Sequence, residues 1–211
     1  AVCLSAIPID SLIASDGSST AESGTRSTGR AGHRDGETDE RGEYPGLTTV
    51  KHGSSTKAIR KQAIADLHLE RLAAAQQQKA SAIVDHLGLY RRLPTISFEC
   101  DPEVYGYFLK NPDVAVSTWR AMEISQFQLN ESGPNQYRAD AGDGSVGNVE
   151  LLLQTHNETL ILCDGAFKSP LLPKPIVARS LMRLQSSFTK EADGRIVGTH
   201  NGDVFVEFPS H

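Results

Sequence analysis

Residues 146–163, VGNVELLLQTHNETLILC, decide the fold class of this chain. Two short apolar runs, Val146 to Leu153 and Thr159 to Cys163, flank His156-Asn157-Glu158, whose residue types favour a tight turn. Short apolar runs joined by turn residues are typical of neighbouring antiparallel strands. We therefore expect a β-hairpin here.

The same pattern continues on both sides of this hairpin. It predicts five further strands, Ile124 to Asn130, Gln136 to Asp140, Ile176 to Phe188, Ile196 to Thr199 and Val204 to Phe208, with Asn201-Gly202-Asp203 as the last turn. The segment Ile176 to Phe188 also fits a helical stripe, but its neighbours and the alternation of its arginines favour a strand. The prediction is an antiparallel meander of about seven strands.

Two short helices are predicted before the meander. Asp101-Pro102-Glu103 and Asn111-Pro112-Asp113 each combine a capping side chain, a proline at the first helical position and an acid near the positive end of the helix dipole. The expected inward residues are Val104, Phe108 and Leu109 in the first helix, and Val116, Trp119 and Met122 in the second. The fold class is therefore predicted to be α+β.

Good helix formers dominate residues 55–88, with a capping Ser55 or Thr56 at the start and Gly88 at the end. One helix is expected, and a break is possible near Ala73 to Gln78, which is nearly neutral all round. Two interpretations stay open: the helix docks on the rest of the domain, or it pairs with a partner or a second copy.

The first quarter of the chain has a different composition. Residues 16–43 contain no large apolar side chain, so residues 16–54 are predicted to be a disordered linker. The apolar start, residues 1–15, fits the remnant of a secretory signal peptide, which favours export to the periplasm or cell envelope. The folded α+β domain is expected at residues 93–211.

Net charge and apolar run lengths exclude two classes of protein. The net charge is -5 and lysines and arginines do not cluster, which argues against nucleic-acid binding. No apolar run approaches the roughly 18 residues of a membrane-spanning helix, so no transmembrane segment is predicted.

The cysteines and histidines carry only weak signals for chemistry. Cys100 and Cys163 either form a disulfide in an oxidising compartment or are two small buried side chains, and Cys163 alone is a poor candidate nucleophile. His156 and His200, with Asp203 or Glu158, would form a metal site only if their turns were adjacent.

The acidic loop at residues 140–148 is a second weak metal candidate. Asp140, Asp143 and Asn148 resemble calcium ligands in type, but their spacing fits a tight glycine turn better. We predict no metal, no cofactor and no catalytic residue.

A ligand site is expected on the concave face of the sheet. Trp119, Phe127 and Tyr137 are the predicted apolar contacts, and Arg179 and Arg183 the candidate partners of a carboxylate or phosphate head group. The alternative for the two arginines is the solvated face of a half-buried strand. The proline-rich segment 170–175 is interpreted as a lid or as simple packing.

Several blocks carry a resemblance to known proteins. Residues 92–105, RLPTISFECDPEVY, with Asn111-Pro112-Asp113, Gly133 to Tyr137 and Asp164 to Phe167, resemble an uncharacterised family of exported bacterial proteins. That resemblance implies export but no activity. Two short helices leading into a curved meander are also distantly similar to START-like helix-grip domains, which hold apolar ligands between sheet and helix. The long closing helix of those domains has no counterpart after the last predicted strand.

The expected function is non-catalytic. We predict a binding or structural protein of the cell envelope that holds an apolar small molecule on a curved sheet. The alternative is an interaction module that binds a protein partner through the 55–88 helix. A hydrolase of unknown substrate is the third interpretation.

Overall fold

The computed structural model describes residues 46–168 and 174–209. Within these ranges one antiparallel sheet contains nine strands: β1 (Leu47–Lys51), β2 (Leu89–Arg92), β3 (Thr95–Glu99), β4 (Gln128–Gly133), β5 (Gln136–Asp140), β6 (Val146–Gln154), β7 (Glu158–Phe167), β8 (Ile176–Lys190) and β9 (Ile196–Glu207). The helices are α2 (Lys57–Ala65), α3 (Ala74–Asp85), α4 (Pro102–Lys110) and α5 (Pro112–Ala121), with a 3₁₀ turn, η1 (Leu69–Arg71). The predicted α+β class is confirmed.

The strand order is β1-β3-β9-β8-β7-β6-β5-β4, so the meander from β4 to β9 is joined at β9 by the earlier strand β3. One edge of β9 pairs with β8, and its other edge pairs with two shorter strands. The first half of β9 pairs with β3, and the second half pairs with β2. The strand that ends the meander therefore connects it to the amino-terminal part of the described chain.

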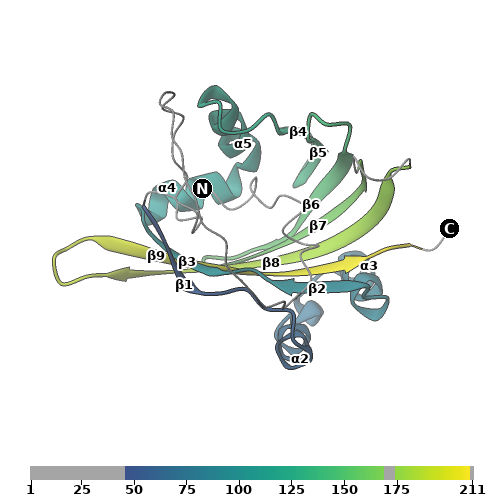
Figure 1. Ribbon diagram of the computed structural model, residues 1–211, viewed down its shortest axis with the longest axis horizontal. Coiled ribbons are helices and arrows are strands. Elements are labelled where there is room, and N and C mark those ends of the chain that lie inside the picture. The colour runs from purple at the N-terminus through teal and green to yellow at the C-terminus, as the bar shows by residue number, and fades with distance from the viewer. Residues whose placement is uncertain (1–45, 169–173, 210–211) are drawn as a thin grey trace, which may run out of the picture.

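The sheet is curved, with helices on both faces. Figure 1 shows α4 and α5 over the concave face and α2 and α3 against the opposite, convex face. Successive side chains of a strand point to opposite faces of the sheet, so each strand contributes to the apolar clusters on both faces. Leu160 and Leu162 of β7 join the helices on the convex side, whereas Ile161 joins α5 on the concave side.

The segment 55–88 differs from the single predicted helix. Thr56 Oγ1 caps the start of α2, as expected, but α2 ends at Ala65. His68 then takes a left-handed backbone conformation with φ of 47° before η1 and α3 follow. The turn brings both Leu67 and Ile83 into the convex core, which a straight helix would not do.

Two further expectations are corrected in the sheet. β1 lies within the range expected to be a linker, because Leu47–Lys51 pairs with β3. Asn201-Gly202-Asp203 is not a turn, since β9 runs through it from Ile196 to Glu207. The predicted strand at Ile176 to Phe188 is confirmed as part of β8.

The two helices that begin at Pro102 and Pro112 form as predicted, but Asn111 makes no capping hydrogen bond at the start of α5, and the buried residues differ in part. Asp101 Oδ1 accepts hydrogen bonds from the backbone N–H of Glu103 and Val104. Val104 and Met122 were expected inside but are 50% and 55% exposed. In α4 the inward stripe is instead Tyr105, Phe108 and Leu109, which follow the i, i+3, i+4 spacing of one helix face.

No helix in the described part of the chain has the length and apolar character needed to cross a membrane.

Candidate ligand-binding cavity

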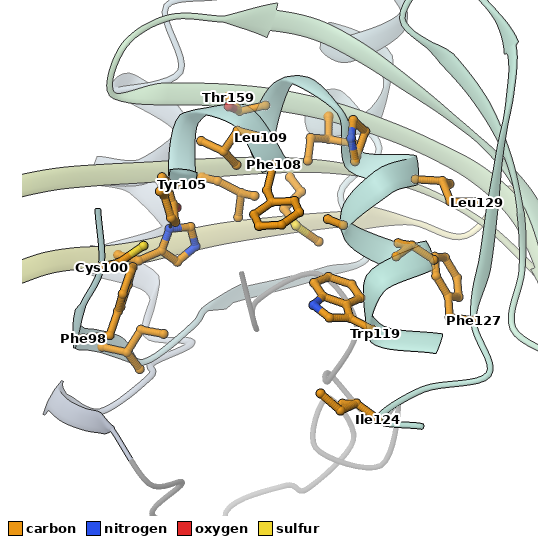
Figure 2. Close-up of a pocket in the computed structure, with 18 of the residues that line it drawn as sticks. Phe98, Cys100, Tyr105, Phe108, Leu109, Trp119, Ile124, Phe127, Leu129 and Thr159 are labelled. Atoms are coloured by element: carbon orange, nitrogen blue, oxygen red, sulfur yellow. Dashed lines mark hydrogen bonds between the residues drawn. The ribbon is translucent and has the colours of Figure 1, made fainter. Parts of the chain in front are cut away.

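A cavity of about 860 Å³ lies between the concave face of the sheet and helices α4 and α5. The wall is formed mostly by apolar side chains. The sheet contributes Ile96, Phe98, Leu129, Val149, Leu151, Ile161, Met182 and Leu184, and the helices contribute Tyr105, Phe108, Leu109, Ala115, Val116 and Trp119. In Figure 2, Phe98 and Tyr105 lie at one end, Trp119 and Phe127 at the other, and Phe108 between them.

The cavity opens beside the carboxyl end of α5. Met122 and Ile124 line it and are 55% and 62% exposed. Gly46, just before β1, and Glu99 of β3 also line the cavity and are exposed, near Phe98. Trp119, in the last turn of α5, is buried, so beside Met122 the wall passes from exposed to buried side chains within about one helical turn.

His200 brings a polar group to the inner wall. It lies in β9 opposite Ile96 of β3 and Ser186 of β8, and its side chain is 3% exposed. Nδ1 of the ring lies 2.7 Å from the hydroxyl oxygen of Tyr105 on α4. Nε2 is buried without a hydrogen-bond partner. Burial lowers the pKa of His200 to about 4, so the ring is neutral at pH 7.

Aromatic rings hold Tyr105 in this position. Its ring lies 5.7 Å from that of Phe98 on β3 and 5.3 Å from that of Phe188 on β8, measured between centroids. Gly198 of β9 makes room for them, because a Cβ there would lie 3.0 Å from both phenylalanine rings. The Tyr105–His200 pair is therefore held in place by packing against two aromatic rings.

Two of the five predicted ligand residues, Trp119 and Phe127, line this cavity. Tyr137 is buried in the apolar cluster next to it and lines a second, smaller cavity of about 350 Å³, as does Arg179. Arg183 lies on the convex face. The structure thus does not bring these five residues together at one site.

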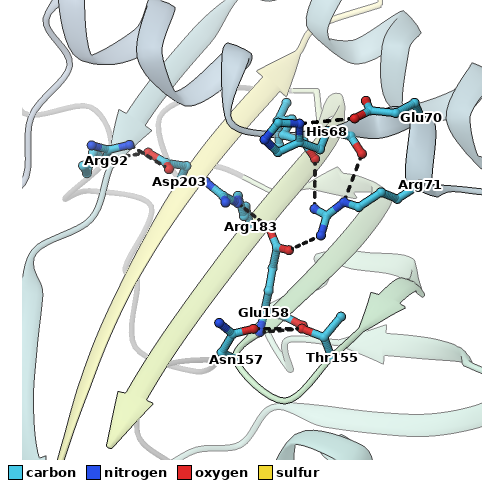
Figure 3. A network of polar contacts seen from close by, with 10 residues as sticks. His68, Glu70, Arg71, Arg92, Thr155, Asn157, Glu158, Arg183 and Asp203 are labelled. Carbon is cyan, nitrogen blue, oxygen red and sulfur yellow. Dashed lines mark hydrogen bonds and ion pairs between the residues drawn. The ribbon is translucent and has the colours of Figure 1, made fainter.

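Both arginines are engaged in ion pairs within the protein. Arg179 donates to Glu207 over 2.8 Å. Arg183 Nε lies 2.5 Å from Glu158, whose other oxygen accepts from Arg71 of η1 over 2.7 Å (Figure 3). Although burial raises it, the pKa of Glu158 is held below its ordinary value by these two guanidinium groups. The two alternatives expected for these arginines were a head-group site and a solvated strand face. The structure instead shows both arginines in ion pairs within the protein.

Cys100 and Cys163 carry free thiols, and both residues line the large cavity. Burial raises the pKa of Cys163 to about 11. The thiol is therefore protonated at pH 7, whereas a nucleophile would need the thiolate. The interpretation of Cys163 as a nucleophile gains no support from its surroundings.

The candidate metal residues do not assemble. His156 is exposed in the β6–β7 turn, whereas His200 is buried in the middle of β9, and Asp203 and Glu158 form ion pairs on the other face of the sheet. Among residues 46–168 and 174–209 no three potential ligands form a metal-binding group. No hydrogen bond joins any two of His156, Cys163, His200 and Asp203.

The acidic loop between β5 and β6 is a turn stabilised by its own side chains. Asp140 accepts from the backbone N–H of Gly142, and Asp143 from that of Ser145. Gly142 and Gly144 both have positive φ. This is the glycine-turn alternative to a calcium loop. The predicted lid falls mainly on residues 169–173, outside the described residues.

Sequence reasoning assigned neither Phe98, Tyr105 nor His200 to a ligand site. Tyr105 had a usable signal, because it precedes Phe108 and Leu109 at helical spacing. His200 had none, since it was assigned to the end of a strand next to a turn that does not form.

Comparison with known proteins adds no relative. No protein-family model matches the chain, and neither the characterised proteins nor the solved structures contain a significant match.

Proposed function

We propose that this chain is a non-catalytic binding protein that holds an apolar small molecule between its curved sheet and helices α4 and α5. The observation that supports this most directly is the cavity of about 860 Å³ with its mostly apolar wall. Ligand pockets typically have volumes of roughly 300 to 1,000 Å³ and are lined mainly by apolar side chains with few polar groups.

The energetics of packing also favour an occupant. Protein interiors are close-packed, and the side chains around a void lose dispersion contacts on that side. Trp119, Leu151, Ile161 and Leu184 are all buried and all face this void. An apolar molecule would recover those contacts without displacing a buried ion pair. Asp203 and Glu158 form their ion pairs on the other face of the sheet, and Glu99 on the cavity wall pairs with Arg195 where both side chains are exposed.

A distant START-like relationship belongs to the same proposal. Two short helices, α4 and α5, follow β3 and lead into the curved meander, and the cavity lies between those helices and the sheet. This part of the layout is similar to that of START-like domains, without their long closing helix in the described residues, and the similarity rests on architecture alone.

The alternative of assembly through residues 55–88 is less well supported. The apolar side chains of α2 and α3, including Ala63, Ala80 and Ile83, pack on the convex face of the same chain. The face that a partner helix would need is therefore already covered.

We also propose export to the periplasm or cell envelope. The support is the apolar start of the sequence, and cell fractionation tests the proposal.

Fluorescence of N-phenyl-1-naphthylamine, a neutral apolar dye, tests the binding proposal. Trp119 is the single tryptophan and lies on the cavity wall, so binding there should transfer its excitation energy to the dye. We expect saturable transfer in the unaltered protein. Transfer that persists unchanged in the cavity-filling variants described next would place the dye at another site.

Filling the cavity provides the matched variants. Ala115→Phe and Val149→Phe place a ring in the void and should abolish dye binding without lowering the melting temperature. Ala58→Phe, on the exposed face of α2, is the control and should bind normally. If both folded cavity variants bind the dye as tightly as the unaltered protein, the proposed function is wrong.

A further inference from the structure

The cavity wall contains a polar atom that the protein leaves unpaired. Among the buried side-chain nitrogens and oxygens without a partner in the described residues, Nε2 of His200 is the one whose residue lines the large cavity. Nδ1 of the same ring is occupied by Tyr105. Nε2 is therefore the ring atom left without a partner at this point of the cavity wall.

Such an atom is costly unless a ligand pairs with it. A buried polar group without a partner destabilises a protein by about 1–3 kcal/mol, because it has lost its hydrogen bonds to water. The neutral ring pairs with either partner type: Nε2 donates when the proton sits there and accepts when Nδ1 carries it. A hydroxyl or a carbonyl group on the ligand would satisfy it.

The rest of the wall argues against a charged group at this point. Among the described lining residues Glu99 is the sole acidic side chain, it is exposed, and there is no lysine or arginine. A carboxylate beside His200 would be buried without a cation, which costs far more than burying an uncharged polar group.

We propose that Nε2 of His200 anchors an uncharged hydrogen-bonding group, a hydroxyl or carbonyl, on an otherwise apolar ligand. This inference rests on the proposed function. It sets the direction of the ligand: the polar group lies beside Tyr105, and the apolar part extends past Phe108 towards Trp119, as the arrangement in Figure 2 allows.

Displacement of N-phenyl-1-naphthylamine by three ten-carbon compounds tests the anchor. 1-Decanol and 2-decanone carry the required group, and 1-chlorodecane has similar shape without it. The measured quantity is the ratio of affinities, alcohol or ketone to chloride, in the unaltered protein and in His200→Phe. The free energy of removing each compound from water is the same for both proteins, so a change in the ratio between them reports on residue 200 alone. We expect the ratio to fall about 3- to 10-fold in His200→Phe, the range for one hydrogen bond.

The control variant is His156→Phe, the same substitution at an exposed histidine, which should leave the ratio unchanged. Decanoate at pH 7.5 should displace the dye much more weakly than 1-decanol. An unchanged ratio in His200→Phe, or displacement by decanoate equal to that by 1-decanol, overturns the anchor while dye binding still supports the cavity. Failure of the dye to bind the unaltered protein overturns both proposals.

Nitrogen-15 NMR of the unaltered protein keeps the test independent of how His200→Phe folds. 1-Decanol should shift the Nε2 resonance of His200 and 1-chlorodecane should not. Equal shifts with both compounds would show that the ring senses occupancy rather than a hydrogen bond, and would overturn the proposal.

Discussion

Tyr90 of β2 donates its hydroxyl to Asp203 of β9 over 2.6 Å, deep in the sheet. The carboxylate of Asp203 is 1% exposed and also accepts two hydrogen bonds from Arg92, at 2.8 and 3.0 Å (Figure 3). Burial, followed by the bond to this carboxylate, raises the pKa of Tyr90 well above its ordinary value. These three side chains join β2 to the strand that completes the meander.

Asp203→Asn should destabilise the protein by about 3 kcal/mol, because it leaves a partly buried guanidinium without its counter-charge. Asp193→Asn is the matched control: Arg195 Nε lies 2.7 Å from Asp193, but both side chains are exposed. We expect that variant to lose much less stability than Asp203→Asn, because solvent screens an exposed ion pair. Urea unfolding of both variants gives the comparison, and equal losses would contradict it.

The two arginines that pair with Glu158 should contribute unequally to the stability of the protein. Arg183→Met removes a buried partner from a buried carboxylate and should cost about 3 kcal/mol, whereas Arg71 is partly exposed and Arg71→Met should cost about 1 kcal/mol. The free energy of unfolding in urea measures both. If Arg71→Met lowers the free energy of unfolding more than Arg183→Met does, the ion pair that links η1 to the sheet matters more for stability than the burial of Arg183.

Stability should fall as pH is lowered from about 6.5 to about 4 because of His200. The pKa of this histidine is about 4 in the folded protein, against an ordinary value of 6.5 for a solvated histidine. In this window the unfolded chain therefore binds a proton that the folded chain does not. The full shift corresponds to about 3 kcal/mol.

Unfolding measurements across this pH window should therefore show a slope that His200→Gln reduces. Glu158, whose pKa is lowered, adds a loss of stability below its ordinary pKa of 4.5 in both proteins. His156→Gln, at an exposed site, should keep the full slope. An equal slope in His200→Gln would mean that the His200 ring is not buried in its neutral form.

Two glycines should respond in opposite directions to alanine. Gly106 lies within α4 with open space where a Cβ would stand, so Gly106→Ala should stabilise the protein by about 0.5–1 kcal/mol. At Gly165 of β7 a Cβ would lie 2.6 Å from the carbonyl oxygen of Val146 on β6. Gly165→Ala should lower the melting temperature, and a rise there would show that β6 and β7 approach less closely.

The turn predicted at Asn201-Gly202-Asp203 shows where sequence reasoning failed. The residue types favour a turn, but Asp203 is held by Tyr90 and Arg92, more than a hundred residues earlier. Gly202 accommodates the side chains of Leu184 and Leu93, each 3.1 Å from where a Cβ would stand. Neither contact is visible from neighbours in the sequence.

The sequence by itself determined the local elements: the β6–β7 hairpin, the capped start of α4, the start of α5 at Pro112, and the glycine turn after β5. Each depends on residues a few positions apart, whose backbone preferences and side-chain hydrogen bonds act within one turn. Only the tertiary structure decided the break after α2, the continuity of β9 and the placing of His200 beside Tyr105. Those features depend on contacts between distant segments, and such contacts exist only once the sheet has curved around its helices.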